Sequence, residues 1–165
     1  MRSNLPGVLT LEVHESFGNC PKYITPRSVQ VVPCGVQAPA QPAHAFTGLD
    51  AAARVLVGAA DTFFVATSGG PHGLDISHRG GVPGFAQIDG DSLVIPDLSG
   101  NRYFNTLGNL LLEPRSSLLF IDFLSGDVLT LQGEVKIAWP QRAWRFDVAG
   151  GTLVRSALPL QWQRV

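Results

Sequence analysis

Residues 75–114, DISHRGGVPGFAQIDGDSLVIPDLSGNRYFNTLGNLLLEP, contain the succession of strands, tight turns and one helix that decides the fold. Residues 82–96 comprise two short strands around Asp89-Gly90-Asp91, which is typical of a hairpin. An amphipathic helix is expected next, and Glu113-Pro114 ends it. Its apolar residues recur at helical spacing: Tyr103, Phe104, Leu107, Leu110 and Leu111.

Polar residues of the same stretch indicate a binding site. Arg79 and Arg102 lie beside glycines, where the backbone can approach a ligand closely. Asn101, Asn105 and Asn109 recur every four residues and would form one polar ridge on a helix. A basic turn before a helix favours phosphate, because free N–H groups and the helix dipole both face the anion. The stretch therefore points to a nucleotide-like cofactor.

Simpler interpretations of these residues remain open. A capping role alone would explain Ser99 or Asn101, since either can be the N-cap of the helix without binding a ligand. Arg102 can be an ordinary surface charge. His78 ends the strand of residues 73–79, and we expect a hydrogen-bonded histidine there rather than a general acid or base.

Composition bounds the class of protein. The chain has 165 residues, 45% hydrophobic and 15% charged, with a net charge of −1, so no global field draws it to nucleic acid or to an anionic membrane. Eighteen glycines and twelve prolines favour short strands and turns over a helical bundle. No apolar window reaches the ~18 residues of a membrane span. Without a recognisable export signal, a cytoplasmic location is expected.

Cysteine and histidine spacing gives no metal site. Cys20 and Cys34 lie fourteen residues apart without a CxxC motif, and the four histidines show no ligand spacing with them. A nucleophilic role for Cys20 would need a lowered pKa that no neighbouring residue guarantees, so we expect a half-buried thiol.

The remaining sequence predicts a mostly β chain. Val8–Val13 and Val29–Val32 read as strands, and Pro33–Ala45 reads as a surface connection. Thr47 to Asp50 has the shape of a capping box before a helix that ends near Gly58. Residues 63–68 form the next strand.

The C-terminal half adds strands of different burial. Residues 116–123 are apolar on both faces and should be central in a sheet. In the strand of residues 128–137, Gly133 suggests a bulge or a close backbone approach. A short turn at 139–142 precedes two strand-like runs, 144–148 and 152–155. About eight strands and at least two helices favour a small closed barrel with helices at its ends.

Five segments resemble the FMN-binding split-barrel flavoproteins of the pyridoxamine 5′-phosphate oxidase family, in the branch often fused to a ferredoxin-reductase-type module. These are FGNCPKYI (17–24), SHRGGVPGF (77–85), IPDLSGNRYFNTLGNL (95–110), LLFIDFLSGD (118–127) and LPLQW (158–162). The resemblance covers most of the chain. It implies a mainly β split barrel with peripheral helices over residues 46–165, an N-terminal extension over residues 1–45, and a homodimer with FMN at the interface.

The resemblance also implies roles for single residues. Arg79 and Arg102, with Ser99 and Asn101, would bind the phosphate, although several members have Lys at this turn. Residues of the 78–85 loop and of 96–97 would line the isoalloxazine and ribityl groups, and helix asparagines would approach the cofactor. The expected cofactor-binding residues are His78, Arg79, Gly84, Phe85, Pro96, Asp97, Ser99, Asn101, Arg102, Asn105 and Asn109.

The expected function is an FMN-dependent oxidoreductase that receives electrons from a reductase or ferredoxin-type partner. In fused relatives a reductase module comes next, so either a separate partner supplies the electrons here or that module is missing from this sequence. The alternatives are a flavin-binding electron carrier without its own substrate, a haem-binding relative with His14 or His78 as axial ligand, and a cofactor-free interaction protein. No acid–base or nucleophile–base pair identifies a catalytic residue. Arg155 and Arg164 look isolated, so a second phosphate site for pyridoxamine phosphate is not expected.

Overall fold

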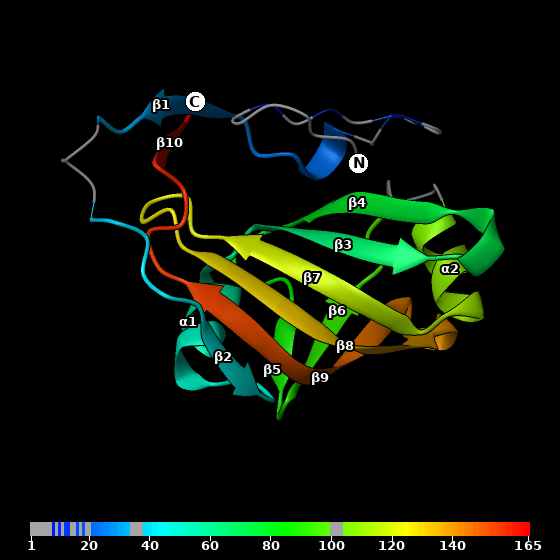
Figure 1. Ribbon diagram of the computed structural model, residues 1–165. Helices are drawn as coiled ribbons and strands as arrows, with labels where there is room; N and C mark the ends of the chain where they lie inside the picture. Colours follow the sequence, from blue (N-terminus) through cyan, green and yellow to red (C-terminus); the bar gives the residue numbers. More distant parts are fainter. Residues whose placement is uncertain are drawn as a thin grey trace.

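Strands dominate the described chain (Figure 1). The computed structural model describes residues 8, 10, 12–13, 16, 18, 21–33, 38–99 and 104–165. Its strands are β1 (Arg27–Val31), β2 (His44–Thr47), β3 (Thr62–Ser68), β4 (Leu74–Gly80), β5 (Gln87–Asp89), β6 (Ser92–Pro96), β7 (Arg115–Ile121), β8 (Val128–Ala138), β9 (Ala143–Val154) and β10 (Leu160–Arg164). The helical segments are α1 (Ala51–Ala59) and α2 (Asn105–Leu112), with single 3-10 turns η1 (Pro21–Tyr23), η2 (Gly70–His72) and η3 (Trp139–Gln141).

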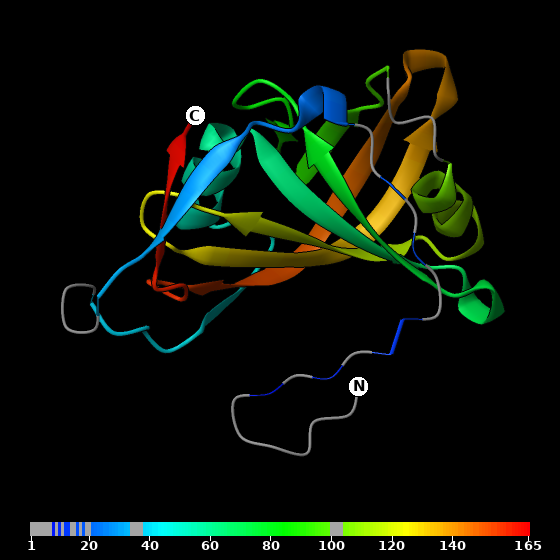
Figure 2. The same ribbon diagram turned by 90° about the horizontal axis from the view of Figure 1, so that it is seen from above.

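One antiparallel sheet curls around the core without closing (Figure 2). Its strand order is β4-β3-β7-β8-β9-β6-β5, and β2 also pairs with β9. The expected mainly β split barrel with peripheral helices is confirmed, whereas the expected closure of the sheet is wrong. The split lies between β4 and β5, the two ends of the strand order, and in the connection between them Gly81 and Gly84 donate their N–H groups to the carbonyls of Asp61 and Ala60.

The two helices cover opposite ends of the barrel (Figure 1). Helix α1 begins after Asp50, whose carboxylate accepts a hydrogen bond from the N–H of Ala53 at 2.7 Å. The N-cap is therefore Asp50, and the expected capping box that begins at Thr47 is wrong, because Thr47 is the last residue of β2. Helix α2 has Phe104 as its N-cap residue, which has no capping side-chain bond, so Ser99 does not cap this helix.

Strands β8 and β9 form the long hairpin at the centre of the sheet. The predicted irregularity at Gly133 is confirmed as a register shift between Gln132 and Gly133. The expectation of two separate strands at 144–148 and 152–155 is wrong, since β9 runs through both. Gly150 and Gly151 keep the strand continuous there, because their missing side chains make room for Phe46 of β2.

A second, two-stranded sheet pairs the first strand of the chain with the last. Strand β1 pairs with β10, from Arg27 opposite Arg164 to Val31 opposite Leu160. This β1–β10 ribbon lies at the same end of the barrel as α1 (Figure 1). Strand β2 begins inside the region that was expected to be a connection. Of the predicted strand Val8–Val13, residues 9 and 11 lie outside the described residues, and the four described residues are not assigned to a strand.

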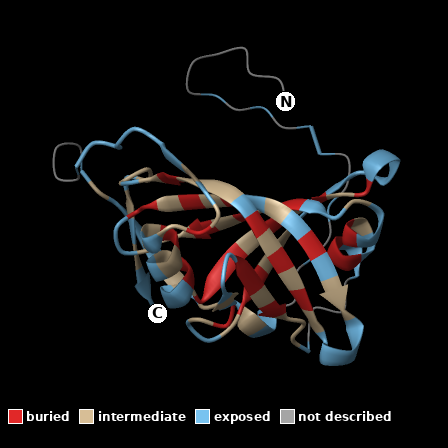
Figure 3. Ribbon diagram, turned by 90° about the horizontal axis from the view of Figure 1, so that it is seen from below, coloured by how far each residue is buried: buried red, intermediate tan, exposed pale blue. Residues whose placement is uncertain are grey.

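Buried residues occur along the strands of the barrel (Figure 3), and the core that they form is aromatic and aliphatic. Phe63 of β3 contacts Phe120 of β7 and Trp144 of β9, at ring-centroid distances of 5.0 and 6.2 Å. Strand β7 is central, as expected, between β3 and β8. Its inward residues Leu118 and Phe120 are completely buried, whereas the outward residues Leu119 and Ile121 are half-buried.

Candidate functional site

Polar side chains gather where the inner face of β4 meets α2. Thr106 of α2 donates a hydrogen bond to Asp75 of β4 at 2.5 Å, and both residues are buried. One turn further along, Asn109 donates to the hydroxyl of Thr67 on β3 at 3.1 Å. Apolar residues of α2 pack on the core beside these bonds, so the helix is positioned on the sheet by both apolar and polar contacts.

Arg79 is the buried cation of this region. Its exposed fraction is 3%, and its Nε–H has no hydrogen-bond partner among the described residues. Burial lowers the pKa of Arg79, while the carboxylates of Asp97 and Asp75 oppose that shift. Neither carboxylate, nor any other among the described residues, lies within the 4.0 Å of an ion pair with this guanidinium. Asp97 and Asp75 therefore offset the charge of Arg79 from a distance, without forming an ion pair with it.

Two carboxylate oxygens near Arg79 also have no partner. Oδ1 of Asp75 and Oδ1 of Asp97 are both buried, and no donor in the described part of the chain bonds to them. Asp97 follows directly after β6, where its backbone N–H donates to the carbonyl of Arg142 at 2.7 Å. Because buried polar atoms are normally paired, this donor and these two acceptors need partners that the described residues do not supply.

The 81–85 loop is anchored to the core. Gly84 has a φ of +78°, which favours glycine, and its N–H donates to the carbonyl of Ala60 at 3.0 Å. The Phe85 ring stacks on Phe63 with a centroid distance of 5.5 Å and is 8% exposed. Gly84 and Phe85 thus fix the course of the loop, and Phe85 lies in the core.

His78 and Arg79 point to opposite faces of β4, as neighbours on a strand must. The ring of His78 contacts Phe64 at a centroid distance of 5.9 Å. Burial lowers the pKa of His78, and the positive charge of Arg79 lowers it further. His78 therefore lies on the outer face of the sheet, apart from the cluster of Arg79, Asp75 and Asp97. The other histidine considered as a haem ligand, His14, lies outside the described residues.

The other predicted residues lie at the edge of this cluster. Pro96 is the last residue of β6 and pairs with Ala143. Ser99 is exposed and accepts a hydrogen bond from Nζ of Lys22 at 3.1 Å. Asn105 is exposed at the first turn of α2. Asn101 and Arg102 lie outside the described residues, so their predicted roles stay predictions.

Three residues of this region were missed by sequence reasoning. Asp75 and Thr106 have no motif of their own, and only the packing of α2 on β4 brings them together. Lys22 lies far away in sequence, in the segment FGNCPKYI, and reaches Ser99 across 77 positions. The available signal in the sequence was that FGNCPKYI and the 95–110 segment both resemble the same protein family, which would have suggested that they lie close together.

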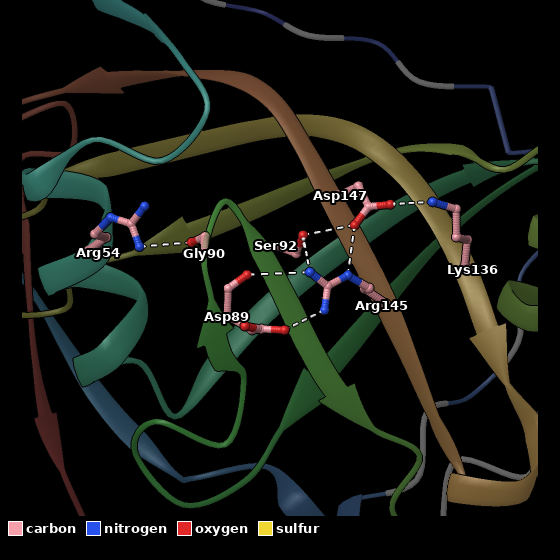
Figure 4. Close-up of polar contacts among 7 residues, drawn as sticks. All are labelled: Arg54, Asp89, Gly90, Ser92, Lys136, Arg145 and Asp147. Carbon is pink, nitrogen blue, oxygen red and sulfur yellow. Dashed lines mark hydrogen bonds and ion pairs between the residues drawn. The ribbon is translucent and has the colours of Figure 1, made fainter.

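A second polar cluster spans β5, β6, β8 and β9, and every member that Figure 4 draws is partnered. Arg145 donates to Asp89 at 2.6 Å and to Asp147 at 3.0 Å. Lys136 and Ser92 also donate to Asp147. These bonds lower the pKa of Asp147 to about 2, and the bond from Lys136 contributes most. Because its groups bond to one another, this cluster has the character of a surface network and not of a ligand site.

The described residues give few other indications of chemistry. No group of three or more His, Cys, Asp or Glu side chains among them is arranged to bind a metal ion. No helix in the described part of the chain is long and apolar enough to cross a membrane. In the cluster around Arg79, the hydroxyl of Thr106 is buried and donates to the carboxylate of Asp75, so the described side chains there can bind and orient a ligand.

Comparison with known proteins gives one kind of match. No protein-family model and no curated protein sequence matches the chain. Among solved structures, it is similar to the crystal structure of a protein from Clostridium acetobutylicum that is related to general stress protein 26 of B. subtilis and is described as of the pyridoxinephosphate oxidase family. The two chains share 14% identity over 68% of this chain and 86% of the other, with a TM-score of 0.38. At this similarity, the function has to be argued from the residues of the site.

Proposed function

We propose that the chain binds flavin mononucleotide where β4, β6 and α2 meet, and that it acts in electron transfer or oxidoreduction. The observation that supports this most directly is Arg79, buried to 3% exposure with an unpartnered Nε–H. A buried charge without a contacting counter-charge costs several kcal/mol. Phosphate is an anion whose oxygens match the guanidinium fork, so its binding would supply the missing contact.

The donor set fits the rest of such a ligand. FMN has a phosphate, which accepts hydrogen bonds, and a ribityl chain, whose hydroxyls donate them. The Nε–H of Arg79 is an unpaired donor, and the Oδ1 atoms of Asp75 and Asp97 are unpaired acceptors. We assign the phosphate to Arg79 and the ribityl hydroxyls to Asp97.

Charge balance requires a second cation. Asp75 and Asp97 already offset the charge of Arg79, so a phosphate dianion at this site needs further positive charge. Lys22 is exposed and hydrogen-bonded to Ser99, which the sequence assigned to the phosphate turn. We infer that Lys22 provides this charge together with the predicted Arg102.

The remaining predicted residues fall into two roles. Asn109 and Phe85 are engaged in packing α2 and the 81–85 loop, so we assign them to positioning the site. Asn105 and Pro96 remain candidates for contact with the cofactor, because Asn105 is exposed and Pro96 is half-buried.

The bound flavin would supply the redox chemistry, and the chain would supply binding and orientation. A reductase or ferredoxin-type partner is the proposed electron donor. The second candidate is a flavin-binding electron carrier without its own substrate. Steady turnover with NAD(P)H, a reductase and a small acceptor would support the enzyme over the carrier.

We also propose a homodimer built on the outer face of β4. Leu74 and Ile76 of this edge strand are 81% and 71% exposed. A groove of about 470 Å³ adjoins Leu74 and crosses β3, β7 and β8. Arg115 and Glu134 lie along this groove, so the same face presents both signs of charge. A two-fold interface places a face against its own copy, which favours such self-complementary charges.

Arg79→Gln tests the phosphate assignment. The loss of a charge-assisted bond of about 1.5–3 kcal/mol should raise the Kd for FMN roughly 10- to 150-fold. The Kd of Arg79→Lys for FMN should lie between those of Arg79→Gln and the native chain, because lysine keeps the charge. The control is Arg54→Gln, on α1 and paired with Asp91, which should bind FMN as the native chain does.

The stability of Arg79→Gln must be measured with its affinity, since Asp75 and Asp97 lose their nearby cation. Lys22→Gln avoids this difficulty, because Lys22 is exposed and its removal leaves the core unchanged. It should weaken FMN binding and reduce the dependence of the Kd on salt. Native affinity in a folded Arg79→Gln variant would remove Arg79 from the site, and native affinity in Lys22→Gln would remove Lys22.

A further inference from the structure

A cavity of about 710 Å³ opens at the other end of the barrel, away from α2. It lies between α1, the turn that joins β7 to β8, and strand β10. Its volume is within the range of ~300–1,000 Å³ that is typical of small-molecule sites. None of the cofactor-binding residues predicted from the sequence lines it.

The β1–β10 ribbon forms one side of this cavity and is fastened by charge. Arg27 of β1 and Arg164 of β10 both bind the carboxylate of Asp61, at 2.7 and 2.8 Å. The guanidinium of Arg27 also lies 4.0 Å from the ring centroid of Phe123. Phe123 meets Trp162 of β10 edge to face at 5.4 Å, so an aromatic wall continues from the turn into the ribbon.

The opposite wall is aliphatic. Leu56 and Ala59 face the cavity from α1, and Ile121 at the end of β7 closes the base between the two walls. A flat apolar ring system fits between a helix side chain and two aromatic rings, since such rings favour stacked or edge-to-face contact.

The charges that line the cavity are three arginines and three aspartates, yet they are not equally accessible. The side chains of Asp61 and Asp127 are 4% and 6% exposed and are each bound by arginine. Asp122 is half-buried, and one of its oxygens accepts from the backbone of its own turn. The side chains of Arg155 and Arg164 are 49% and 62% exposed.

The two exposed arginines retain donors for a ligand. Arg155 uses Nη1 for Asp127, and Arg164 uses Nη2 for Asp61. A guanidinium has five N–H donors, so each can still donate to an anion. The expectation that Arg155 and Arg164 are isolated is therefore wrong, because the fold brings both to one cavity.

From these contacts we propose that the cavity binds a small aromatic anion at a site separate from the flavin site. Its ring system lies between Leu56 and the Phe123–Trp162 wall, and its carboxylate or sulfonate lies against Arg155 and Arg164. The apolar walls provide the affinity for the ring, and the two guanidiniums select the anionic form over a neutral analogue.

The test compares two fluorescent probes of similar ring system on the full chain. Anilinonaphthalene sulfonate carries the anionic group, and N-phenylnaphthylamine lacks it. Both probes should bind saturably. The double variant Arg155→Gln with Arg164→Gln should raise the Kd of the sulfonate probe by about 10-fold or more and should change the Kd of the neutral probe by less than about twofold. The control is Arg115→Gln, exposed and outside the cavity, which should change neither.

Ala59→Trp provides a second variant that keeps every ion pair. Ala59 is exposed on α1 and faces the cavity, so a larger side chain there should block both probes without disturbing the core. The proposal is overturned if native chain binds neither probe, if the double arginine variant weakens both probes equally, or if Ala59→Trp binds both as before. Displacement of the sulfonate probe by stoichiometric FMN would also overturn it, since the cavity would then be the flavin site.

Discussion

Gly133 shows how one residue determines the geometry of the central hairpin. A Cβ at this position would overlap the backbone oxygen of Asp147 and lie 3.0 Å from the ring of Phe146. Strands β8 and β9 approach so closely there because the register shifts between Gln132 and Gly133. The bulge therefore depends on the missing side chain, as the sequence predicted for a glycine inside a strand.

Gly133→Ala should lower the free energy of unfolding by roughly 2 kcal/mol or more, because backbone must move to relieve the overlap. Chemical denaturation measures this change. The matched control is Gly58→Ala, where a Cβ meets nothing within 4 Å and the backbone is helical. It should raise stability by about 0.5–1 kcal/mol. Equal effects of the two substitutions would contradict the packing described for the bulge.

At the scale of elements, α2 depends on one buried hydrogen bond. Thr106 is 1% exposed and donates to Asp75, whose other oxygen has no partner. Thr106→Val keeps the shape but removes the donor. It should cost about 1–3 kcal/mol of stability, since the carboxylate then stays buried without that bond.

Hydrogen exchange of the α2 amides, measured with the unfolding free energy, tests this prediction. Faster exchange confined to α2 and β4 is the expected pattern. Thr130→Val on the outward face of β8 is the control and should leave α2 unchanged. Unaltered exchange in Thr106→Val would mean that the Thr106–Asp75 bond does not position the helix, which would then rest on its apolar contacts and on the bond from Asn109 to Thr67.

Elements with local signals could be predicted from the sequence, and those with distant partners could not. Helix α1, the hairpin at Gly90 and the central position of β7 follow from spacing, turn residues and an apolar run. Strand β2 was missed because its partner, β9, begins about 100 residues later and its own four residues have no alternation. The continuity of β9 through Gly150 and Gly151 was missed because paired glycines normally favour a break.

The residues of the candidate site also divide into those with a local sequence signal and those placed by distant contacts. The sequence named Arg79 and Asp97, which lie in one electrostatic environment. It did not name Asp75, Thr106 or Lys22, whose positions depend on tertiary packing. The residues between 100 and 103, on which much of the sequence argument rested, are outside the described structure, so their part remains a prediction.

At the scale of the whole molecule, the outer face of β4 is the proposed dimer interface. Ile76→Glu places a charge on this face and should shift the chain to the mass of a monomer by light scattering or sedimentation. Val31→Glu, on β1 and equally exposed in the native chain, is the matched control and should leave the dimer intact. A native chain that is already monomeric would contradict the proposed dimer without affecting the assignment of Arg79.

The most direct test of the central claim is a titration of FMN with the purified chain, followed by removal of free flavin. We expect flavin fluorescence to be quenched to saturation at one FMN per chain and flavin absorption bands to remain with the protein. The bound fraction should decrease in Lys22→Gln and Arg79→Gln. Unquenched fluorescence in excess protein, with a colourless product after desalting, would contradict the flavoprotein assignment.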